Sequence, residues 1–467
     1  MSEPKFSVVK HKGNWRPMLF LSLPVLLEET LFLAVTWTDW WLTGHYLSGD
    51  APKAAMGVMG YVMWLVPTLF ASVAIGATAL VSRYVGGNDM LLARKSANQA
   101  MMLGVCFASV LTGFFVVLGP YLVALTQLKG EALEYATRYL SIVAPVVPFI
   151  MMSQISSACL RGAGDTVSGF VVKTIVVVTN VFVSAVLVSG FWFFPEMGWA
   201  GIALGTAIGH AVGGTILAGI LVSGRAGLGI RFRMMKPNFG LIRKLLRIGI
   251  PGGFDLATVV CSQLVFIAII NRLGDRAAAS HGLAVQIEAL AWMPGAAFQV
   301  AAATMAGQFL GAKLPDRAMK AVMTCLWAGG LVMCLAGVVL FFGGNWFAYF
   351  FTGDWNDPTT SITAELLRII SAAMPCLAVV MIFSGALRGA GDTGWSLAFS
   401  SIGFFLVRIP FAMLLAWPYI GFEDGWRIPG FGLGIHGAWY AMLIDLFVRS
   451  VLVGGRIYHG GWKRMSI

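Results

Sequence analysis

Long apolar segments alternate with short polar loops along the entire chain of 467 residues. A helix needs about 20 predominantly apolar residues to cross the hydrocarbon core of a bilayer. Twelve segments reach that length, near residues 18–42, 56–81, 98–126, 138–159, 168–194, 200–223, 246–270, 278–304, 320–350, 366–387, 395–417 and 432–454. The pattern therefore predicts an all-α polytopic membrane protein with twelve transmembrane helices.

The composition supports this class, because 58% of the residues are hydrophobic and only 11% are charged, with a mean hydropathy of +0.81. A soluble domain carries about 25% charged residues. The six cysteines lie singly inside apolar segments, which is typical of small packing residues rather than of a disulfide framework or a metal cluster. We expect no cofactor and no metal site, and no nucleophile–base arrangement indicates an enzyme.

The heptapeptide Leu-Arg-Gly-Ala-Gly-Asp-Thr occurs at residues 160–166 and again, unchanged, at residues 387–393. The separation of 227 positions, close to half the chain, indicates an internal duplication. It predicts two six-helix lobes, residues 1–223 and 246–467, joined by a basic linker at residues 224–245. Since an even number of spans gives both lobes the same orientation, the pseudo-twofold axis between them should run along the membrane normal.

Positive charge is distributed unequally between the two sets of loops. The net charge is +11, and most of the 32 Lys and Arg fall in loops on the side of the two termini, whereas the opposite loops hold seven. The positive-inside rule then predicts a multi-pass cell-membrane protein with both termini in the cytoplasm, in the inner membrane if the source is bacterial. Basic residues that are spread over many loops argue against nucleic acid as a partner.

Several motifs are distributed over nearly the whole chain: Leu23-Pro24 and Thr38-Asp39 in the first span, the Gly86-Gly87 loop, residues 306–312, and both heptapeptides. Together they resemble the multidrug and toxic compound extrusion (MATE) family. The resemblance implies a secondary antiporter that exports organic, often cationic compounds in exchange for H⁺ or Na⁺. Two lobes around a central cavity suit alternating access, and we expect the chain to act as a monomer in the lipid bilayer.

Asp39 is the main candidate for coupling. A carboxylate inside the membrane is costly and normally faces a cavity or a partner. Glu28 precedes Asp39 by 11 residues, which puts both on one face of the first span, roughly 16 Å apart along the axis. The resemblance places Asp39 at the aspartate position of the family's first-span motif and so implies cation or proton binding. Alternatively, Asp39 marks the interfacial belt formed by Trp37, Trp40 and Trp41.

Glu28 and Asp255 are duplicate positions, each four residues after a duplicated proline, Pro24 or Pro251. Proline removes a backbone donor and can kink a helix, so it exposes carbonyl groups beside each carboxylate. We regard the two prolines as candidate hinges. Two interpretations of the carboxylates remain open. They form a pair of cation or proton sites, or they cap the opened backbone or pair with a helix-end base.

Two further residues complete the candidate coupling set. Glu288 lies on the eighth span near Gln286, and with Gln263 of the seventh span it predicts a second polar cluster in the C-terminal lobe. Asn180 in the fifth span is followed by Ser184, where some MATE members have an aspartate. The tenth span also lacks the carboxylate of Na⁺-coupled branches. Both departures from the family pattern favour H⁺ over Na⁺.

The substrate cavity should be apolar and adaptable, because Met side chains are flexible and aromatic faces bind cations. Candidates lie near the duplicated prolines of the second and eighth spans, with two glutamines as polar contacts. These cavity residues are Met63, Trp64, Gln263, Gln286, Trp292 and Met293. An alternative function is a flippase for a lipid-linked or amphipathic substrate. It ranks second because a phosphate-bearing head group requires a strongly cationic cavity, and few basic residues lie within the spans.

The charged residues of the duplicated loops are expected to be structural. Glycine permits a tight turn, aspartate and threonine can cap the next helix, and arginine can neutralise helix-end carbonyl groups. The loop residues assigned to this role are Arg161, Asp165, Arg388 and Asp392.

Two intramembrane ion pairs are also expected. Arg408 should pair with Asp255 or Glu288, and Asp445 should pair with Arg449, one helical turn later.

Overall fold

A computed structural model describes residues 8–49, 51–125, 128–191, 194–421 and 427–465. Within these residues, twelve helical segments are long and apolar enough to cross a membrane. The predicted number of spans and the helical class are therefore confirmed. The structure extends the predicted spans by several residues at most of their ends, because apolar length alone does not define where a helix stops.

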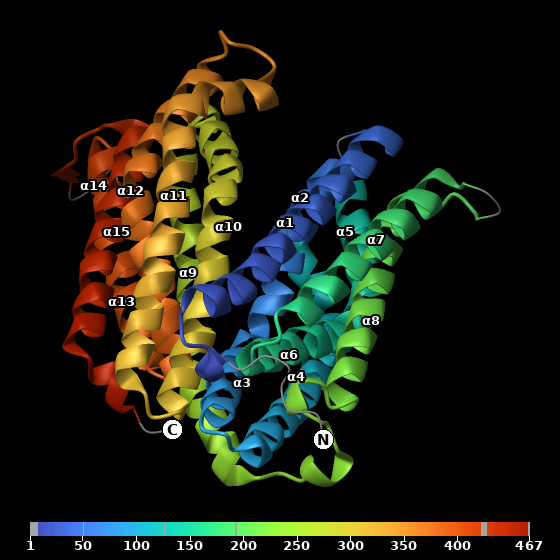
Figure 1. Cartoon of the computed structure of the whole chain (residues 1–467). Helices are drawn as coiled ribbons and strands as arrows, with labels where there is room; N and C mark the ends of the chain where they lie inside the picture. The colour runs from blue at the N-terminus through green and yellow to red at the C-terminus, as the bar shows by residue number, and fades with distance from the viewer. Residues whose placement is uncertain (1–7, 50, 126–127, 192–193, 422–426, 466–467) are drawn as a thin grey trace. The chain divides into compact units, whose positions relative to one another are not determined.

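The chain divides into two compact units. The N-terminal unit comprises Met1–His11 and Phe20–Gly253, and the C-terminal unit comprises Lys12–Leu19 and Phe254–Ile467. Figure 1 colours the chain by residue number, so most of the first unit runs from blue to green and most of the second from yellow to red. The first and seventh spans each contribute residues to both units.

The N-terminal unit is built from long helices with short 3₁₀ turns between some of them. In chain order these elements are η1 (Val8–Lys10), α1 (Trp15–Tyr46), α2 (Ala51–Leu69), α3 (Ala71–Gly86), α4 (Met90–Leu125), α5 (Glu131–Val143), η2 (Ala144–Val146), α6 (Val147–Ala163), α7 (Val167–Ser189), α8 (Trp199–Val222), η3 (Arg225–Gly227) and η4 (Phe232–Met234).

The C-terminal unit repeats this order with fewer interruptions. Its elements are α9 (Phe239–Asn271), α10 (Asp275–Gly311), α11 (Pro315–Thr352), α12 (Pro358–Ala390), α13 (Thr393–Ser401), the π-helical η5 (Ile402–Arg408), α14 (Ile409–Ala416), β1 (Tyr419–Gly421), β2 (Arg427–Pro429), α15 (Gly434–His459) and η6 (Gly461–Arg464). The antiparallel pair β1–β2 was not predicted and is the one sheet in the described residues.

The duplicated prolines act differently in the two units. Pro67 lies near the end of α2, which stops at Leu69. Phe70 lies between α2 and α3, and its amide donates a hydrogen bond to the Pro67 carbonyl oxygen at 3.1 Å. Pro294, its duplicate, lies inside the continuous α10. Pro24 and Pro251 lie inside the unbroken helices α1 and α9. A proline alone therefore does not determine whether these helices break.

Both duplicated loops end their helices in the same way. Gly164 and Gly391 follow α6 and α12 in the left-handed region, with φ of +95° and +83°. The amide of the next aspartate bonds to a leucine carbonyl oxygen five residues back, at 2.8 Å in each loop. This is the Schellman arrangement that a glycine permits without steric cost. The tight turn expected from the sequence is present in both copies.

Candidate cation-coupling site

Asp39 lies in α1 within the N-terminal unit, and only 7% of it is exposed. Its carboxylate is hydrogen-bonded to Thr206 of α8. The neighbouring tryptophans Trp37, Trp40 and Trp41 are 51%, 43% and 58% exposed. The aromatic residues thus have the exposure of an interfacial belt, whereas the carboxylate points inward to polar partners. Asp39 is therefore buried, although the tryptophans next to it in the sequence are exposed.

Thr206 is the centre of the polar contacts around Asp39. Its hydroxyl oxygen accepts hydrogen bonds from the Tyr139 hydroxyl at 3.2 Å and from Asn180 Nδ2 at 3.1 Å. A threonine hydroxyl has two acceptor positions and one hydrogen. With both acceptor positions used, that hydrogen is left to be donated to the Asp39 carboxylate. Four residues from α1, α5, α7 and α8 therefore form one buried network.

Two oxygens of this network have unused acceptor capacity. Within the described part of the chain, Asp39 Oδ1 and Asn180 Oδ1 are buried and accept no hydrogen bond. Buried polar atoms of this kind are rare and require an explanation. A carboxylate oxygen can take up a proton, and carboxylate and amide oxygens are also the hard ligands that Na⁺ would use. The network is thus chemically suited to bind a small cation.

Close packing of α7 against α8 positions Asn180. Gly209 of α8 faces this residue, and a Cβ atom there would lie 3.3 Å from the Asn180 Cβ. Gly205 of α8 packs against Ser184 of α7 in the same way. Small residues let two membrane helices approach closely, so that short polar side chains meet. Ser184 is buried, as is Asn180.

Sequence reasoning identified Asp39 and Asn180 but missed Thr206 and Tyr139. Thr206 follows Gly205 directly, and the glycines of α8 recur every fourth residue at this face. That spacing marks the face packed against α7 and was the available signal for Thr206. Tyr139 is an ordinary aromatic residue in the sequence, and only the arrangement of α5 brings it to the site.

Glu28 is not part of this network. Its Oε2 atom lies 2.6 Å from Arg161 of the first duplicated loop. Lys173 interacts electrostatically with Glu28 and Glu29, and its Nζ lies 5.3 Å from the Phe32 ring centroid. The sequence left open whether Glu28 is a cation or proton site or pairs with a base at a helix end. In the structure, Glu28 forms such a pair with Arg161.

Asp255 repeats this arrangement in the C-terminal unit. Its Oδ2 atom accepts hydrogen bonds from Arg388 and from the Ser396 hydroxyl, both at 2.8 Å. Only 1% of Asp255 is exposed. Each duplicated loop arginine thus binds a carboxylate on the first helix of its own half.

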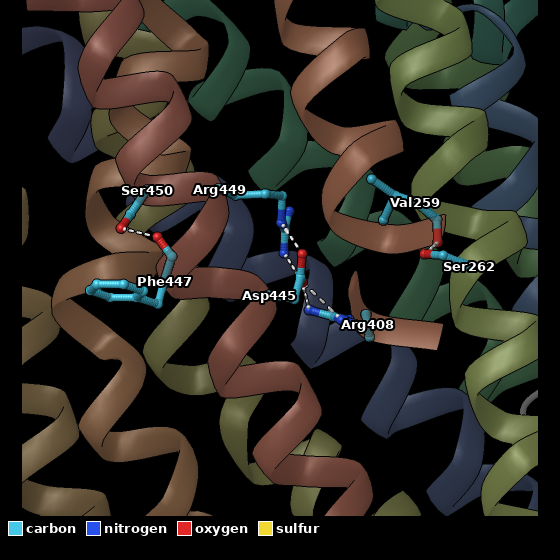
Figure 2. Close-up of polar contacts among 7 residues, drawn as sticks. All are labelled: Val259, Ser262, Arg408, Asp445, Phe447, Arg449 and Ser450. Carbon is cyan, nitrogen blue, oxygen red and sulfur yellow. Dashed lines mark hydrogen bonds and ion pairs between the residues drawn. The ribbon is translucent and has the colours of Figure 1, made fainter. Parts of the chain in front are cut away.

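The predicted partner of Arg408 was wrong, because Arg408 pairs with Asp445 and with neither Asp255 nor Glu288. The Arg408 guanidinium lies 2.8 Å from Asp445 Oδ2. Arg449 also binds this carboxylate, with hydrogen bonds of 2.8 and 2.7 Å, which confirms the predicted pair on α15. Figure 2 shows Asp445 between the two arginines. Sequence spacing does not reveal which helix faces η5, and this is why the partner was missed.

Glu288 lies in α10 and is partly buried. Among the described residues it makes no hydrogen bond to Gln263 or Gln286, and Gln286 is exposed. Its charged neighbour is Arg408. The polar cluster predicted around Glu288 is therefore replaced by an electrostatic contact with the Arg408 region.

The candidate cavity residues differ in burial. Trp64 and Trp292, which lie shortly before the duplicated prolines Pro67 and Pro294, are 43% and 44% exposed. Met63 is partly buried, whereas Met293 is only 7% exposed. The two tryptophans thus offer accessible aromatic faces in their units, and the role of all these residues in substrate binding stays a prediction.

A family model described as MatE matches residues 24–186 and 251–414, one stretch in each half of the chain. Among curated proteins, a probable multidrug resistance protein NorM of Thermotoga maritima is 25% identical over 97% of this chain and 94% of its own length. The probable multidrug resistance protein YoeA of Bacillus subtilis is 24% identical over 100% of this chain and 98% of its own.

Solved structures share the fold. A MOP superfamily transporter from Pyrococcus furiosus superposes with a TM-score of 0.89 at 18% identity and covers 100% of both chains. An outward-facing multidrug resistance MATE transporter of the same superfamily gives the same TM-score, identity and coverage. At this level of identity the similarity establishes the fold alone.

Proposed function

Because the chain belongs to the MatE family of membrane transporters, we propose that it exports organic, drug-like cations in exchange for an inward-moving H⁺ or Na⁺. It is a multi-pass membrane protein and a transporter, not an enzyme. Two relatives that match nearly the whole chain carry the name of probable multidrug resistance proteins, which supports drug-like compounds as the substrate class.

The observation that carries the coupling proposal is the buried network of Asp39, Asn180, Thr206 and Tyr139. Its single carboxylate suffices for one proton, and Ser184 occupies the position where an additional carboxylate would strengthen Na⁺ binding. The network therefore favours H⁺ as the coupled ion. Taking up a proton removes the buried negative charge, so binding and release change the electrostatics of α1.

Substrate binding relies on accessible aromatic faces. Trp64 and Trp292 lie shortly before the duplicated prolines Pro67 and Pro294, with nearly equal exposure. Indole rings attract cations most strongly among the aromatic side chains, and a flat organic cation can also stack on them. The flexible Met63 and Met293 and the amide groups of Gln263 complete the proposed contacts.

Transport is proposed to follow alternating access in a monomer, with both termini in the cytoplasm. A flippase is the second candidate, but the observed pairs argue against it. Arg161, Arg388, Arg408 and Arg449 each bind a carboxylate of the protein. Their guanidinium groups are therefore already bound to carboxylates of the protein rather than free to hold a phosphate-bearing head group.

Ethidium efflux from proteoliposomes tests this function directly. The purified protein is reconstituted, and a proton gradient and a Na⁺ gradient are imposed separately at equal membrane potential. We expect efflux that depends on the proton gradient and that stops when a protonophore is added. Efflux driven by Na⁺ alone would contradict the choice of ion. If no gradient drives efflux of ethidium or other cationic dyes, the exporter proposal fails.

A further inference from the structure

The loop between α8 and α9 is fastened by its backbone to the start of α4. Asn98 of α4 is fully buried. Its side-chain amide donates to the Gly229 carbonyl oxygen at 3.1 Å and accepts from the Arg231 amide at 2.8 Å. Arg94, one turn earlier on α4, donates to the Gly227 carbonyl oxygen from two of its nitrogens, at 3.1 and 3.0 Å. The first half of the loop is therefore held in place by α4.

Gln99 holds the second half of this loop. Its Nε2 atom donates to the carbonyl oxygens of Met234 and Lys236, both at 2.9 Å, and its Oε1 atom accepts from the Asn238 amide at 2.9 Å. Asn238 in turn caps α9, because its Oδ1 atom accepts a hydrogen bond from the Leu241 amide at 3.1 Å. Both hydrogens and the oxygen of the Gln99 amide are thus used. The loop and the start of α9 therefore have one defined conformation on α4.

This fixed segment exposes a group of cations. From Arg225 to Phe254 the sequence contains no acidic residue. Six basic side chains of the segment are exposed, and within the described residues none of them forms an ion pair or a side-chain hydrogen bond. We call them the linker cations, and they are Arg231, Arg233, Lys236, Arg243, Lys244 and Arg247.

Two acidic residues that lie beside the loop or the start of α4 have other partners. Asp165 pairs with Arg225, the first basic residue of the loop, at 2.7 Å. Asp89, in the turn before α4, accepts a hydrogen bond from the Leu92 amide at 3.0 Å and so caps that helix. A concentration of like charges repels itself and attracts anions from outside the chain. The linker cations therefore form a surface suited to an anionic partner.

Apolar side chains are exposed beside the linker cations. Phe239, the first residue of α9, is 82% exposed, and Ile250 is 46% exposed. Arg243, Arg247 and Ile250 follow one another at helical spacing, so they share one face of α9. On that face the exposed side chains change from basic to apolar within about two turns. This is the pattern of a helix that passes from the head-group region of a bilayer into its hydrocarbon core.

An anionic phospholipid satisfies both features of this surface. Its phosphate group binds guanidinium and ammonium groups through charge-assisted hydrogen bonds. Its acyl chains cover exposed apolar side chains such as Phe239 and Ile250, which gains the free energy of removing them from water. A soluble phosphate compound offers the charge but leaves these apolar side chains uncovered. The combination of charge and apolar surface therefore favours a lipid.

We propose that the linker cations form a binding site for an anionic phospholipid, held in shape by Asn98 and Gln99 of α4. The head group binds Arg243, Lys244 and Arg247 on α9 together with the basic side chains of the loop, and the acyl chains lie along α9. All of these residues belong to the N-terminal unit. The site lies outside the buried coupling network and goes beyond the proposed function.

Native mass spectrometry of the full-length protein in detergent micelles measures lipid binding directly and requires no transport. The probes are dioleoylphosphatidylglycerol, which is anionic, dioleoylphosphatidylcholine, which has the same acyl chains and no net charge, and glycerol phosphate, which has the anionic group without the chains. We expect phosphatidylglycerol to bind about tenfold more tightly than phosphatidylcholine, and glycerol phosphate not to bind. This preference should fall as salt is added, because exposed charges are screened.

Two matched variants locate the site. The double variant Arg243→Gln and Arg247→Gln should reduce the preference for phosphatidylglycerol to about twofold or less. The control double variant Arg16→Gln and Arg464→Gln removes the same charge from exposed positions in the other unit and should keep the full preference. All four substitutions change exposed side chains, which a folded protein usually tolerates.

Gln99→Met tests whether the fixed loop matters, since it changes no charge. Methionine has nearly the volume of glutamine but cannot hold the loop backbone. We expect phosphatidylglycerol to bind about fivefold more weakly, because the cations lose their fixed arrangement. Thermal unfolding without added lipid checks that the variant is folded. The double variants decide the proposal even if Gln99→Met is not.

Four results would overturn the proposal. The wild type binds phosphatidylglycerol and phosphatidylcholine equally, or glycerol phosphate binds as tightly as phosphatidylglycerol, which would indicate a site for soluble anions. The preference survives in the double variant of α9, or it falls as much in the control double variant. Unchanged binding in a folded Gln99→Met protein would show that the cations attract lipid without a site built by α4, and it would contradict the proposal as well.

Discussion

The guanidinium group of Arg388 lies 2.8 Å from the carboxylate of Asp255, 133 residues earlier in the chain. Arg161 and Glu28 repeat this relationship at 2.6 Å and the same separation of 133 residues. Each heptapeptide thus binds the carboxylate that follows the duplicated proline on the first helix of its half. The repeated heptapeptide and the repeated carboxylate after the proline, both of which indicated the duplication in the sequence, are therefore in direct contact in each half.

The aspartates of the two loops make a second connection. Asp165 pairs with Arg225, just after α8, at 2.7 Å, and Asp392 pairs with Arg456, near the end of α15, at 2.8 Å. Each loop therefore contacts the first helix of its half through its arginine, and through its aspartate it contacts either the turn after α8, in the first half, or the end of α15, in the second. The heptapeptide is preserved in both halves as a structural connection, and its charges are used inside the protein.

Removing the carboxylate of the Asp255–Arg388 pair should destabilise the protein more than removing the carboxylate of the equivalent Glu28–Arg161 pair. For Asp255→Asn, we expect a loss of about 3–5 kcal/mol in the free energy of unfolding, because Arg388 keeps a buried charge without its partner. Glu28→Gln should cost less, since the Glu28 side chain is 15% exposed and that of Asp255 1%. Thermal unfolding of the detergent-solubilised variants measures both effects. Asp316→Asn, at a 92% exposed side chain, is the control, and equal losses at positions 28 and 255 would contradict the argument.

Thr206→Val should disrupt the candidate coupling site. Valine has nearly the shape of threonine but leaves the Tyr139 hydroxyl and the Asn180 amide without their acceptor. An unpaired buried donor costs about 1–3 kcal/mol. We expect lower thermal stability and strongly reduced ion-driven efflux. Thr206→Ser keeps the hydroxyl group and should retain both, so similar behaviour of the two variants would show that the hydrogen bonds are not what matters.

Asp39→Asn should separate substrate binding from ion coupling. The amide nearly preserves the size of the side chain but removes the group that takes up a proton. We expect ethidium to bind with unchanged affinity, measured by fluorescence, while efflux driven by a proton gradient falls to the level of empty liposomes. Asp316→Asn should transport normally. Undiminished proton-driven efflux in Asp39→Asn would remove Asp39 from the coupling mechanism.

The twelve spans were predictable because membrane crossing depends on a local property, the length of an apolar segment. The break between α2 and α3 and the π-helical turn at Ile402–Arg408 were not. Pro67 and Pro294 have the same local sequence role, yet one lies beside a break and the other inside a continuous helix. Such differences depend on the packing around a helix, which its own sequence does not contain.

The candidate site was predictable only where a residue is conspicuous on its own. A carboxylate in an apolar segment stands out because of its cost, and the resemblance to the family's first-span motif then singled out Asp39. Thr206 and Tyr139 are unremarkable in such segments, and they become important only because four helices, α1, α5, α7 and α8, meet at the site. The partner of Arg408 was missed for the same reason, because the sequence suggested Asp255 or Glu288 and does not show which helix faces Arg408.

Lys313 offers a stabilising substitution that follows from the duplication. The turns after α3 and α10 are equivalent, and they place Asn88 and Lys313 in the left-handed region, with φ of +59° and +60°. Asparagine tolerates this conformation, whereas lysine is strained by about 1–2 kcal/mol. Because the Lys313 side chain is exposed, Lys313→Gly should raise the free energy of unfolding by about 1 kcal/mol, after the entropy lost by glycine. Thermal unfolding in detergent measures the gain, and Asn88→Gly is the matched control with a smaller expected effect. A gain at position 88 as large as that at 313 would show that relief of lysine strain is not the cause.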